Sequence, residues 1–381
     1  MASSTDVLIF VEDPGAANFV AELPAALAER GLHARLLTDG SATDYLQQRG
    51  VSVETAPRAA TAESVLASAQ PRLLTVGTSE NPDTLGLALV AQARSTGVHS
   101  VGVVDGAANA EHRFRGRSDA PLAYAPDWLL VPDEWTKDAY IALGYPEDRA
   151  IECGHPHYDH VRAVAFRLAA DDRKDLRRSL LPGASDESRV VVFVAESSNG
   201  LNGQQYQRSA DYTLTGRGKS TGRTEVVLEE FADAVRLATP LPYLVLRLHP
   251  KNTAHELATY LDEFDLVSRG GSPLEWLYVA DLVVGMTSMS LVEAALLGRP
   301  TLSILPRKAE VEWLPTIRSG ITPCVTTREE LRSSIVDMLR QGPETSYPSL
   351  DSFFASGSLD RAAKTIEGIL NRTIEVSKLA R

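Results

Sequence analysis

Several residue classes are scarce in this 381-residue chain, and each scarcity excludes a class of protein. Only two cysteines are present, too few for a disulfide framework or a cysteine-based metal site, so we expect a reducing compartment. Lysine and arginine number 38 against 50 aspartates and glutamates, and the net charge of −12 argues against general binding to nucleic acid or to an anionic membrane. No apolar run approaches the ~20 residues that span a bilayer. We therefore expect no nucleic-acid partner and no stable membrane insertion.

Several sequence signals are also missing. The N-terminal segment lacks the basic and apolar regions of a signal peptide, which predicts a cytoplasmic protein. There is no Gly-x-Gly-x-x-Gly, P-loop or Gly-x-Ser-x-Gly motif, which disfavours dinucleotide oxidoreductases, P-loop ATPases and proteins with a nucleophile elbow. The tract from His155 to His160 holds three histidines without further ligands at zinc spacing, so we expect no metal site.

The residues that are present predict a two-domain α/β protein. A chain of this length exceeds the ~250–300 residues at which single cores stop growing. Apolar runs alternate with helical patterns in both halves, which indicates βαβ units, parallel sheets and right-handed crossovers. The expected strands lie at residues 7–11, 33–38, 51–54, 73–76, 98–104, 128–131, 189–195, 243–248, 281–284 and 301–305. We therefore predict two Rossmann-like domains that face each other across a cleft.

The domain boundaries follow from composition. The first domain is expected to cover residues 1–165 and the second residues 166–358. Residues 359–381 form a helical pattern, and this two-lobed plan allows such a helix to cross back to the first domain. The polar segment 197–224 lacks apolar periodicity and is expected to be a long loop of the lid or binding type. Its arginines and lysine either meet an anionic ligand or form a solvated charged run.

One candidate site follows the expected strand at 243–248, in the segment Arg247-Leu248-His249-Pro250. Ligands of open α/β sheets bind beyond the carboxyl ends of the strands. A histidine at such an end can donate to a phosphate oxygen or take part in acid–base chemistry. Arg247 is expected on the same side as His249. The alternative is that His249 only closes a loop.

A second candidate follows the short strand that ends near Gly285. Thr287, Ser288 and Ser290 come at the start of an expected helix, whose free N–H groups and positive dipole end suit a phosphate group. Glu293 fits either a capping box with Ser290 or a carboxylate that holds a ribose diol. Because capping does not explain three hydroxyls after a glycine, we expect this helix start to bind an anion together with the histidine of the first candidate.

Three strand ends supply candidate acid–base groups. Asp105 closes the longest apolar strand of the first half, where a carboxylate can serve as a general base, although an Asp-Gly pair is also a common turn signal. Asp13, with Glu12 before it, follows the first strand, and Glu196 follows the first strand of the second half. All of these carboxylates are kept as catalytic candidates.

These motifs resemble bacterial glycosyltransferases of the GT-B fold. The segment from Arg247 to Pro250 resembles the His-Pro motif of sialyltransferases and capsule polysaccharide transferases. Thr287 to Ser290, with Glu293 and the later Gly298-Arg299-Pro300, resembles the stretch that grips the nucleotide phosphates and ribose in those families. Asp105-Gly106 is similar to the acidic motif that supplies the base, except that Val104 stands where the family has an acid.

The resemblance implies a metal-independent, inverting glycosyltransferase without a bound cofactor. A nucleotide sugar would be the co-substrate and a small molecule or glycan the acceptor. Asp105 would deprotonate the acceptor, while His249 and Ser288 would stabilise the departing phosphate. Two alternatives stay open: an enzyme like the UDP-N-acetylglucosamine 2-epimerases, which share this fold, and a non-catalytic nucleotide-sugar or glycan-binding protein. A homodimer is a possible assembly.

Overall fold

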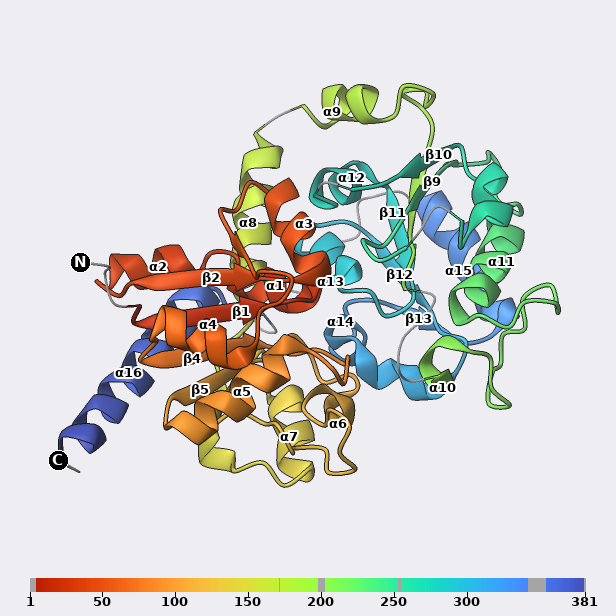
Figure 1. The fold of residues 1–381 in the computed structure, drawn as a ribbon. Coiled ribbons are helices and arrows are strands. Elements are labelled where there is room, and N and C mark those ends of the chain that lie inside the picture. Colours follow the sequence, from red (N-terminus) through yellow and green to blue (C-terminus); the bar gives the residue numbers. More distant parts are fainter. Residues whose placement is uncertain are drawn as a thin grey trace. The chain divides into compact units, whose positions relative to one another are not determined.

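The computed structural model describes residues 5–170, 172–197, 203–252, 255–270, 272–341 and 354–379. The chain forms two compact units. Unit 1 comprises Met1–Asp159 with Phe354–Arg381, and unit 2 comprises His160–Phe353. Each unit is a parallel sheet with helices between its strands, which confirms the expected pair of Rossmann-like α/β domains (Figure 1). The boundaries expected at 165/166 and 358/359 stay predictions.

Unit 1 contains a seven-stranded parallel sheet in the order β3-β2-β1-β4-β5-β6-β7. Strand β1 has the sequence VLIFV and is buried at every position, as expected for a parallel strand covered on both faces. The strands are β1 (Val7–Val11), β2 (Ala34–Thr38), β3 (Glu54–Thr55), β4 (Leu73–Gly77), β5 (His99–Val103), β6 (Trp128–Val131) and β7 (Ala150–Glu152).

Helices cover both faces of this sheet and leave its carboxyl edge to loops. They are α1 (Pro14–Val20), α2 (Leu23–Glu29), α3 (Gly40–Gln48), α4 (Ala62–Ala69), α5 (Leu85–Thr96), α6 (Ala110–Arg113), α7 (Glu134–Ala142), the 3-10 helix η1 (Glu147–Arg149) and the first residues of α8 (Pro156–Ala169). The apolar side chains of the two faces form separate cores, one around Ile9 and Phe19 and the other around Phe10 and Leu74.

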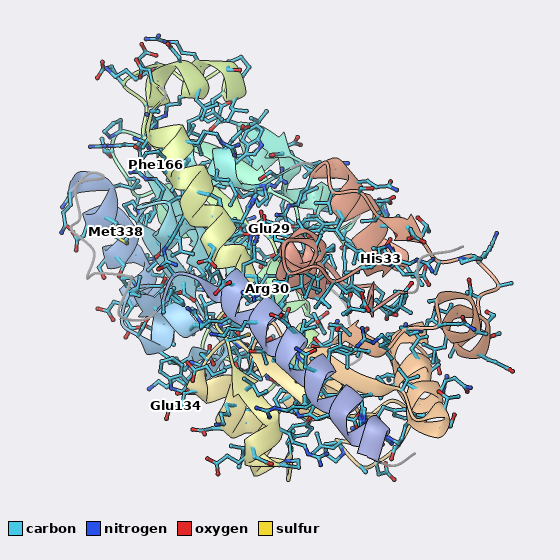
Figure 2. All side chains as sticks on the ribbon, turned by 90° about the vertical axis from the view of Figure 1, so that its left-hand side faces the viewer. Glu29, Arg30, His33, Glu134, Phe166 and Met338 are labelled. Carbon is cyan, nitrogen blue, oxygen red and sulfur yellow. The ribbon has the colours of Figure 1, made fainter. Side chains whose placement is uncertain are left out.

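The C-terminal helix α16 (Ser358–Leu379) completes the core of unit 1. Ala362 and Ile366 are fully buried in the same core as β1 and α2. Arg30, at the end of α2, donates to Glu367 of α16 at 2.8 Å, and Figure 2 shows Arg30 beside this helix. The last helix of the sequence therefore belongs structurally to the first unit.

Unit 2 contains a six-stranded parallel sheet in the order β10-β9-β8-β11-β12-β13. The strands are β8 (Val190–Val194), β9 (Tyr243–Arg247), β10 (Leu266–Ser268), β11 (Leu282–Gly285), β12 (Thr301–Ile304) and β13 (Cys324–Val325). Around them lie α9 (Arg173–Leu180), α10 (Gly203–Tyr206), α11 (Arg223–Val235), η2 (Ala258–Glu263), α12 (Leu274–Val279), α13 (Met289–Leu296), η3 (Lys308–Trp313), α14 (Pro315–Arg318) and α15 (Arg328–Gln341). Phe193 and Phe231, whose ring centroids are 5.0 Å apart, join β8 and α11 in one core.

The polar segment expected to be a long loop packs against the rest of unit 2 in its described part. Residues 198–202 of the segment lie outside the described residues. After them, Leu214 is 1% exposed in the unit 2 core, and Thr213 donates from its backbone to Pro306 at 2.7 Å. Arg217 forms ion pairs with Asp233 at 2.7 Å and Glu263 at 2.6 Å. Apolar and ionic contacts therefore hold the described residues around Thr213 to Arg217 against the core of unit 2.

Candidate functional site

The strand order places a topological switch point in each unit. In unit 1 the order reverses between β1 and β4, and in unit 2 between β8 and β11. At such a point the loops that leave the carboxyl ends of neighbouring strands diverge, and ligands of open α/β sheets bind in the space they leave. Every carboxylate that we singled out as a catalytic candidate follows a strand of one of these sheets.

In unit 1, Asp105 follows β5 and forms an ion pair with Arg113, the last residue of α6. The Arg113 guanidinium also donates to the hydroxyl of Thr78, directly after β4, at 2.9 Å. Burial by itself raises the pKa of the Asp105 carboxyl, but the charge of Arg113 and the neighbouring His155 more than offset it, so this pKa lies below its usual value. Asp105 is therefore an ionised carboxylate with a side chain still 18% exposed.

Gly15 makes room for this carboxylate. A Cβ atom added to Gly15, near the start of α1, would lie 1.9 Å from Oδ2 of Asp105. Only a residue without a side chain allows this approach. The β1–α1 connection and the end of β5 are thus in direct contact at the switch-point edge.

His155 belongs to the same edge, in the turn between β7 and α8. It is 3% exposed and stacks on Tyr158 with a centroid distance of 4.8 Å. Its Nδ1 accepts from the backbone N–H of His157 at 3.3 Å, which assigns the proton of the neutral ring to Nε2. Burial, together with the neighbouring His157, lowers the pKa of His155 to about 3, so the ring is neutral at physiological pH. In the sequence, His155 stood out only as part of a histidine tract that lacks the spacing of a zinc site.

The start of α16 holds the turn that carries His155. Arg361 donates from Nε to the backbone oxygen of Cys153 at 3.0 Å. Asp159 accepts from the backbone N–H groups of Gly357 and Leu359, both at 2.9 Å. Gly154 has a φ of +79°, and a Cβ there would lie 2.2 Å from the Ser358 hydroxyl. The C-terminal helix is therefore part of the scaffold of the unit 1 edge.

The loop after β1 places two further carboxyl groups at the switch point, and the loop after β4 supplies two hydroxyls next to them. Asp13 is the N-cap residue of α1 and is partly exposed. Glu12 is half-buried and accepts hydrogen bonds from the side chains of Thr84 and Ser79. Burial raises the pKa of Glu12, and the negative charges of the nearby Asp13 and Asp39 raise it further. The hydrogen bonds from the two hydroxyls lower it by less, so the pKa of Glu12 lies above its usual value.

In unit 2, Glu196 lies at the switch point, but its carboxylate is already bound within the protein. Arg223 donates to it at 2.6 Å, and the backbone N–H and hydroxyl of Thr287 also donate to it. Arg223 is 2% exposed and donates from Nε to Glu310, which is fully buried, at 3.0 Å. Glu196 therefore joins β8, α11 and the loop after β11 through a buried ionic network. Because both of its carboxylate oxygens already accept hydrogen bonds within the protein, it is poorly placed to act as a catalytic base.

The start of α13 lies next to this network. Ser288 is the N-cap residue, and its hydroxyl oxygen accepts from the Ser290 N–H at 3.2 Å. Ser288 and Ser290 are both partly exposed, whereas Glu293 is 3% exposed within the helix. A Cβ on Gly285 would lie 2.6 Å from Val194, so packing against β8 explains this glycine. The hydroxyls of the helix start can still donate outward because a hydroxyl accepts and donates at once.

His249 and Arg247 differ in their surroundings. The His249 ring is partly exposed, and its Nδ1 accepts from the backbone N–H of Lys251 at 3.1 Å, which leaves Nε2 as the donor of the neutral form. Arg247 is 7% exposed and donates to Ser268 of the neighbouring strand β10 at 2.8 Å. His249 is thus suited to a ligand contact, and Arg247 to holding the sheet edge.

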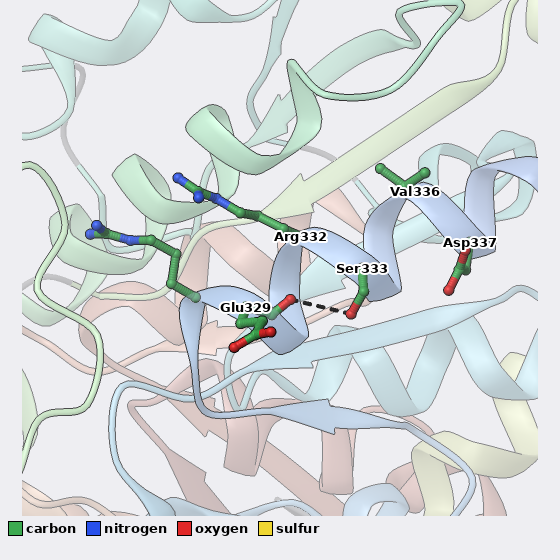
Figure 3. Close-up of a pocket in the computed structure, with 6 residues that line it drawn as sticks. Glu329, Arg332, Ser333, Val336 and Asp337 are labelled. Carbon is green, nitrogen blue, oxygen red and sulfur yellow. Dashed lines mark hydrogen bonds between the residues drawn. The ribbon is translucent and has the colours of Figure 1, made fainter.

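A hollow of about 580 Å³ lies elsewhere on unit 2, and Figure 3 shows the side chains that line it. Its lining consists of Arg328, Glu329, Arg332, Ser333, Val336 and Asp337. All six belong to the single helix α15, and the Ser333 hydroxyl donates to the Glu329 backbone oxygen at 3.2 Å. Because ligand sites need polar groups that converge from several elements, this open hollow is not the candidate site.

Two further properties bear on the class of site. Within the described ranges, no three His, Cys, Asp or Glu side chains gather in a way that could hold a metal ion. In the same part of the chain, no helix combines the length and apolar character needed to cross a membrane.

Comparisons with known proteins agree on the fold. No model of a known protein family matches the sequence, and no curated protein matches it either. Among solved structures, the UDP-GlcNAc 2-epimerase from Neisseria meningitidis bound to UDP-GlcNAc has a TM-score of 0.61 at 14% identity, over 99% of both chains. The UDP-GlcNAc 2-epimerase from Methanocaldococcus jannaschii in complex with UDP-GlcNAc and UDP has a TM-score of 0.65 at 13% identity, over 97% of this chain and 100% of that one. Staphylococcus aureus MnaA with UDP has a TM-score of 0.65 at 13% identity, over 96% of this chain and 97% of that one.

These neighbours correct the expectation of a glycosyltransferase. Two of the three structures just described are UDP-GlcNAc 2-epimerases, which supports the alternative reading of the motifs over the main one. The particular resemblance to capsule polysaccharide and sialyltransferase-like families is not supported, although the GT-B fold that these enzymes share with the epimerases is.

Proposed function

We propose that this protein is an enzyme that inverts the configuration at C2 of a nucleotide sugar, with UDP-GlcNAc as the first substrate to test. The observation that carries the proposal is the ionised, partly exposed Asp105 carboxylate at the strand-end edge of unit 1. The likeness to 2-epimerases along nearly the whole length of both chains supports it.

The chemistry of the reaction explains why an ionised carboxylate matters. Inversion at C2 requires that the C2–H bond break on one face and re-form on the other. The C2 hydrogen of a sugar is not acidic, but the diphosphate on C1 is a good leaving group. When a base removes the C2 proton, the electron pair of the C–H bond can form a C1=C2 bond as the C1–O bond to the diphosphate breaks. Asp105, with a lowered pKa, is available as that base at neutral pH.

Unit 2 offers groups that suit the nucleotide. The Ser288 and Ser290 hydroxyls and the Nε2 of His249 are potential hydrogen-bond donors on strand-end loops of the second sheet. A phosphate at a helix N-terminus is stabilised by N–H groups and by the helix dipole. Arg247 and Glu293, being almost fully buried, support these loops and do not contact the nucleotide in this proposal.

The test follows the C2 hydrogen by NMR. UDP-GlcNAc is incubated with the full-length protein in D₂O, and both deuterium incorporation at C2 and formation of the C2 epimer are measured. We expect both in the wild type, and a loss of about 10²–10⁴-fold in Asp105→Asn, the usual contribution of an acid–base group. Asp148→Asn, an exposed aspartate in η1, is the matched control and should behave as the wild type.

The nucleotide part is tested by binding. UDP should raise the melting temperature of the wild type, and Ser288→Ala and His249→Ala should reduce this rise at equal UDP concentration. Binding of UDP-GlcNAc without exchange or epimer formation would refute the enzyme and favour a binding protein. No binding of UDP or UDP-GlcNAc by the folded protein would refute the whole proposal.

A further inference from the structure

The proposed inversion requires a second proton-carrying group. Asp105 accepts the C2 proton on one face of the sugar, so a proton must reach C2 from the opposite face. Asp105 cannot supply that proton itself, because a group that returns the proton to the face from which it came restores the original configuration. The second group must therefore come from another element at the same sheet edge.

Glu12 meets this requirement by its place in the fold. It is the first residue after β1, at the switch point, and Asp105 follows β5, with β4 lying between the two strands. The same β1–α1 connection contacts Asp105 directly, through Gly15. Both carboxyl groups thus border one edge from different strands, and both are only partly buried.

The carboxyl group of Glu12 is held in place by two buried hydroxyls. The Thr84 hydroxyl oxygen accepts from the Gly86 N–H at 2.8 Å, and the Ser79 hydroxyl oxygen accepts from the Asn81 N–H at 3.2 Å. These backbone bonds orient both hydroxyls so that their protons can point to Glu12, with which both side chains form hydrogen bonds. Thr84 and Ser79 are each 6% exposed, so these two side chains are shielded from water.

We propose that Glu12 is the catalytic acid that protonates C2 on the face opposite Asp105. This inference rests on the proposed 2-epimerase function and names its second catalytic residue.

The charges around Glu12 favour this assignment. Burial and the carboxylates of Asp13 and Asp39 raise the pKa of Glu12, against the two hydroxyls that lower it. The pKa of Asp105 is lowered, since Arg113 and His155 outweigh the effect of its burial. Two carboxyl groups whose environments move their pKa values in opposite directions are the usual pattern of an acid and a base in one site.

The proton balance closes over one turnover. Asp105 takes the proton as the C2–H and C1–O bonds break and the C1=C2 bond forms, and the diphosphate leaves with the C1–O electron pair. Glu12 then gives its proton to the other face of C2, the C1=C2 electron pair forms the new C–H bond, and a diphosphate oxygen re-forms the bond to C1. Asp105 ends protonated and Glu12 ionised, and exchange with water resets both. The reverse reaction uses the two groups in exchanged roles.

The experiment compares exchange with inversion in Glu12→Gln, using UDP-GlcNAc and its C2 epimer as separate substrates in D₂O. One of the two epimers loses its C2 proton to Asp105. With that epimer, the rate of deuterium exchange at C2 in the variant should stay within about tenfold of the wild-type rate, while the rate of inversion should fall by about 10²–10⁴-fold. With the other epimer, exchange should fall as well, because there Glu12 is the base. Asp105→Asn should show the opposite pattern: exchange should be kept with the epimer whose C2 proton Glu12 removes and lost with the epimer whose C2 proton Asp105 removes.

Glu29→Gln is the matched control, because Glu29 is an exposed glutamate of the same unit at the end of α2 (Figure 2). It should keep both rates with both substrates. Loss of exchange and inversion in equal measure in Glu12→Gln, with both substrates, would show a structural role and overturn the inference, as would retention of inversion. A wild type that neither exchanges nor inverts would instead refute the proposed function, and the inference with it.

Discussion

Replacing Gly15 with alanine probes the contact that brings the β1–α1 connection to Asp105. The new Cβ would lie 1.9 Å from Oδ2 of Asp105, whereas ordinary contacts of a Cβ begin at 3.4 Å. The carboxylate cannot simply rotate away, because Arg113 holds its other oxygen. The substitution must therefore either displace Asp105 from Arg113 or push α1 away from the sheet.

The balance of energies predicts a destabilised unit 1. Alanine by itself favours the helix by up to about 1 kcal/mol over glycine. Against this, overpacking costs about 1–3 kcal/mol, and breaking a buried ion pair by moving one partner costs about 3–5 kcal/mol. Because α1 and Asp105 can share the displacement, we expect a net loss of about 2 kcal/mol, which lowers the melting temperature of a domain of this size by about 4–8 °C.

Differential scanning calorimetry at pH 7 measures this loss, with Gly106→Ala as the control. Gly106 is adjacent to Asp105 in sequence, but a Cβ there has no atom within 4 Å, so its melting temperature should change little. The lowered pKa of Asp105 means that its ionic stabilisation is present above the unfolded pKa of about 3.9 and is lost as the pH falls through the folded value. An equal effect of the two substitutions would refute the idea that Asp105 is held against α1.

Two further predictions concern buried charges in each unit. Arg223→Met removes one partner of the fully buried Glu310 and should lower the free energy of unfolding of unit 2 by about 3–5 kcal/mol. Arg217→Met removes an ion pair from a more exposed cluster and should lower it by at most about 1 kcal/mol. Equal losses for the two variants in urea or thermal unfolding would contradict this difference. His155 has a pKa of about 3 in the folded state and about 6.5 in the unfolded state, so the unfolded state binds more protons between these two pH values. The free energy of unfolding must therefore fall as the pH drops below about 6.5, by up to about 1.4 kcal/mol per pH unit. His155→Phe should flatten the dependence of the unit 1 melting temperature on pH between 7 and 5, and an unchanged dependence would contradict the assignment.

The central strands could be predicted from the sequence because they are buried on both faces. β1 and β8 are continuous apolar runs, VLIFV and VVVFV, which is the pattern of parallel strands under helices. The two-residue edge strands β3 and β13 carry no periodicity to detect. The 3-10 helix η2 (Ala258–Glu263) could not be told from an α-helix in the sequence, because the spacing of apolar residues in so short a segment does not distinguish the two helix types.

The positions of the site residues were predictable, but their partners were not. Asp105 and Glu196 both follow buried strands, so the sequence places each at a sheet edge. The partner of Asp105, Arg113, is eight residues away and lies within the same motif. The partners of Glu196 come from far along the chain, with Arg223 27 residues and Thr287 91 residues away. No local pattern indicates such a network, which is why Glu196 and Asp105 looked equivalent as candidate bases.

The two switch points consequently suit different tasks. In unit 2, Glu196 and Arg223 already hold opposite charges at 2.6 Å, so neither gains much from a new ionic partner. A ligand there meets neutral donors such as the Ser288 hydroxyl, which suits a nucleotide that must leave and return within one turnover. In unit 1, Glu12 and Asp105 are partly exposed, and their pKa values are moved in opposite directions by burial and neighbouring charges. Proton transfer needs such a difference between two groups, so we assign the proton transfer of the proposed reaction to unit 1.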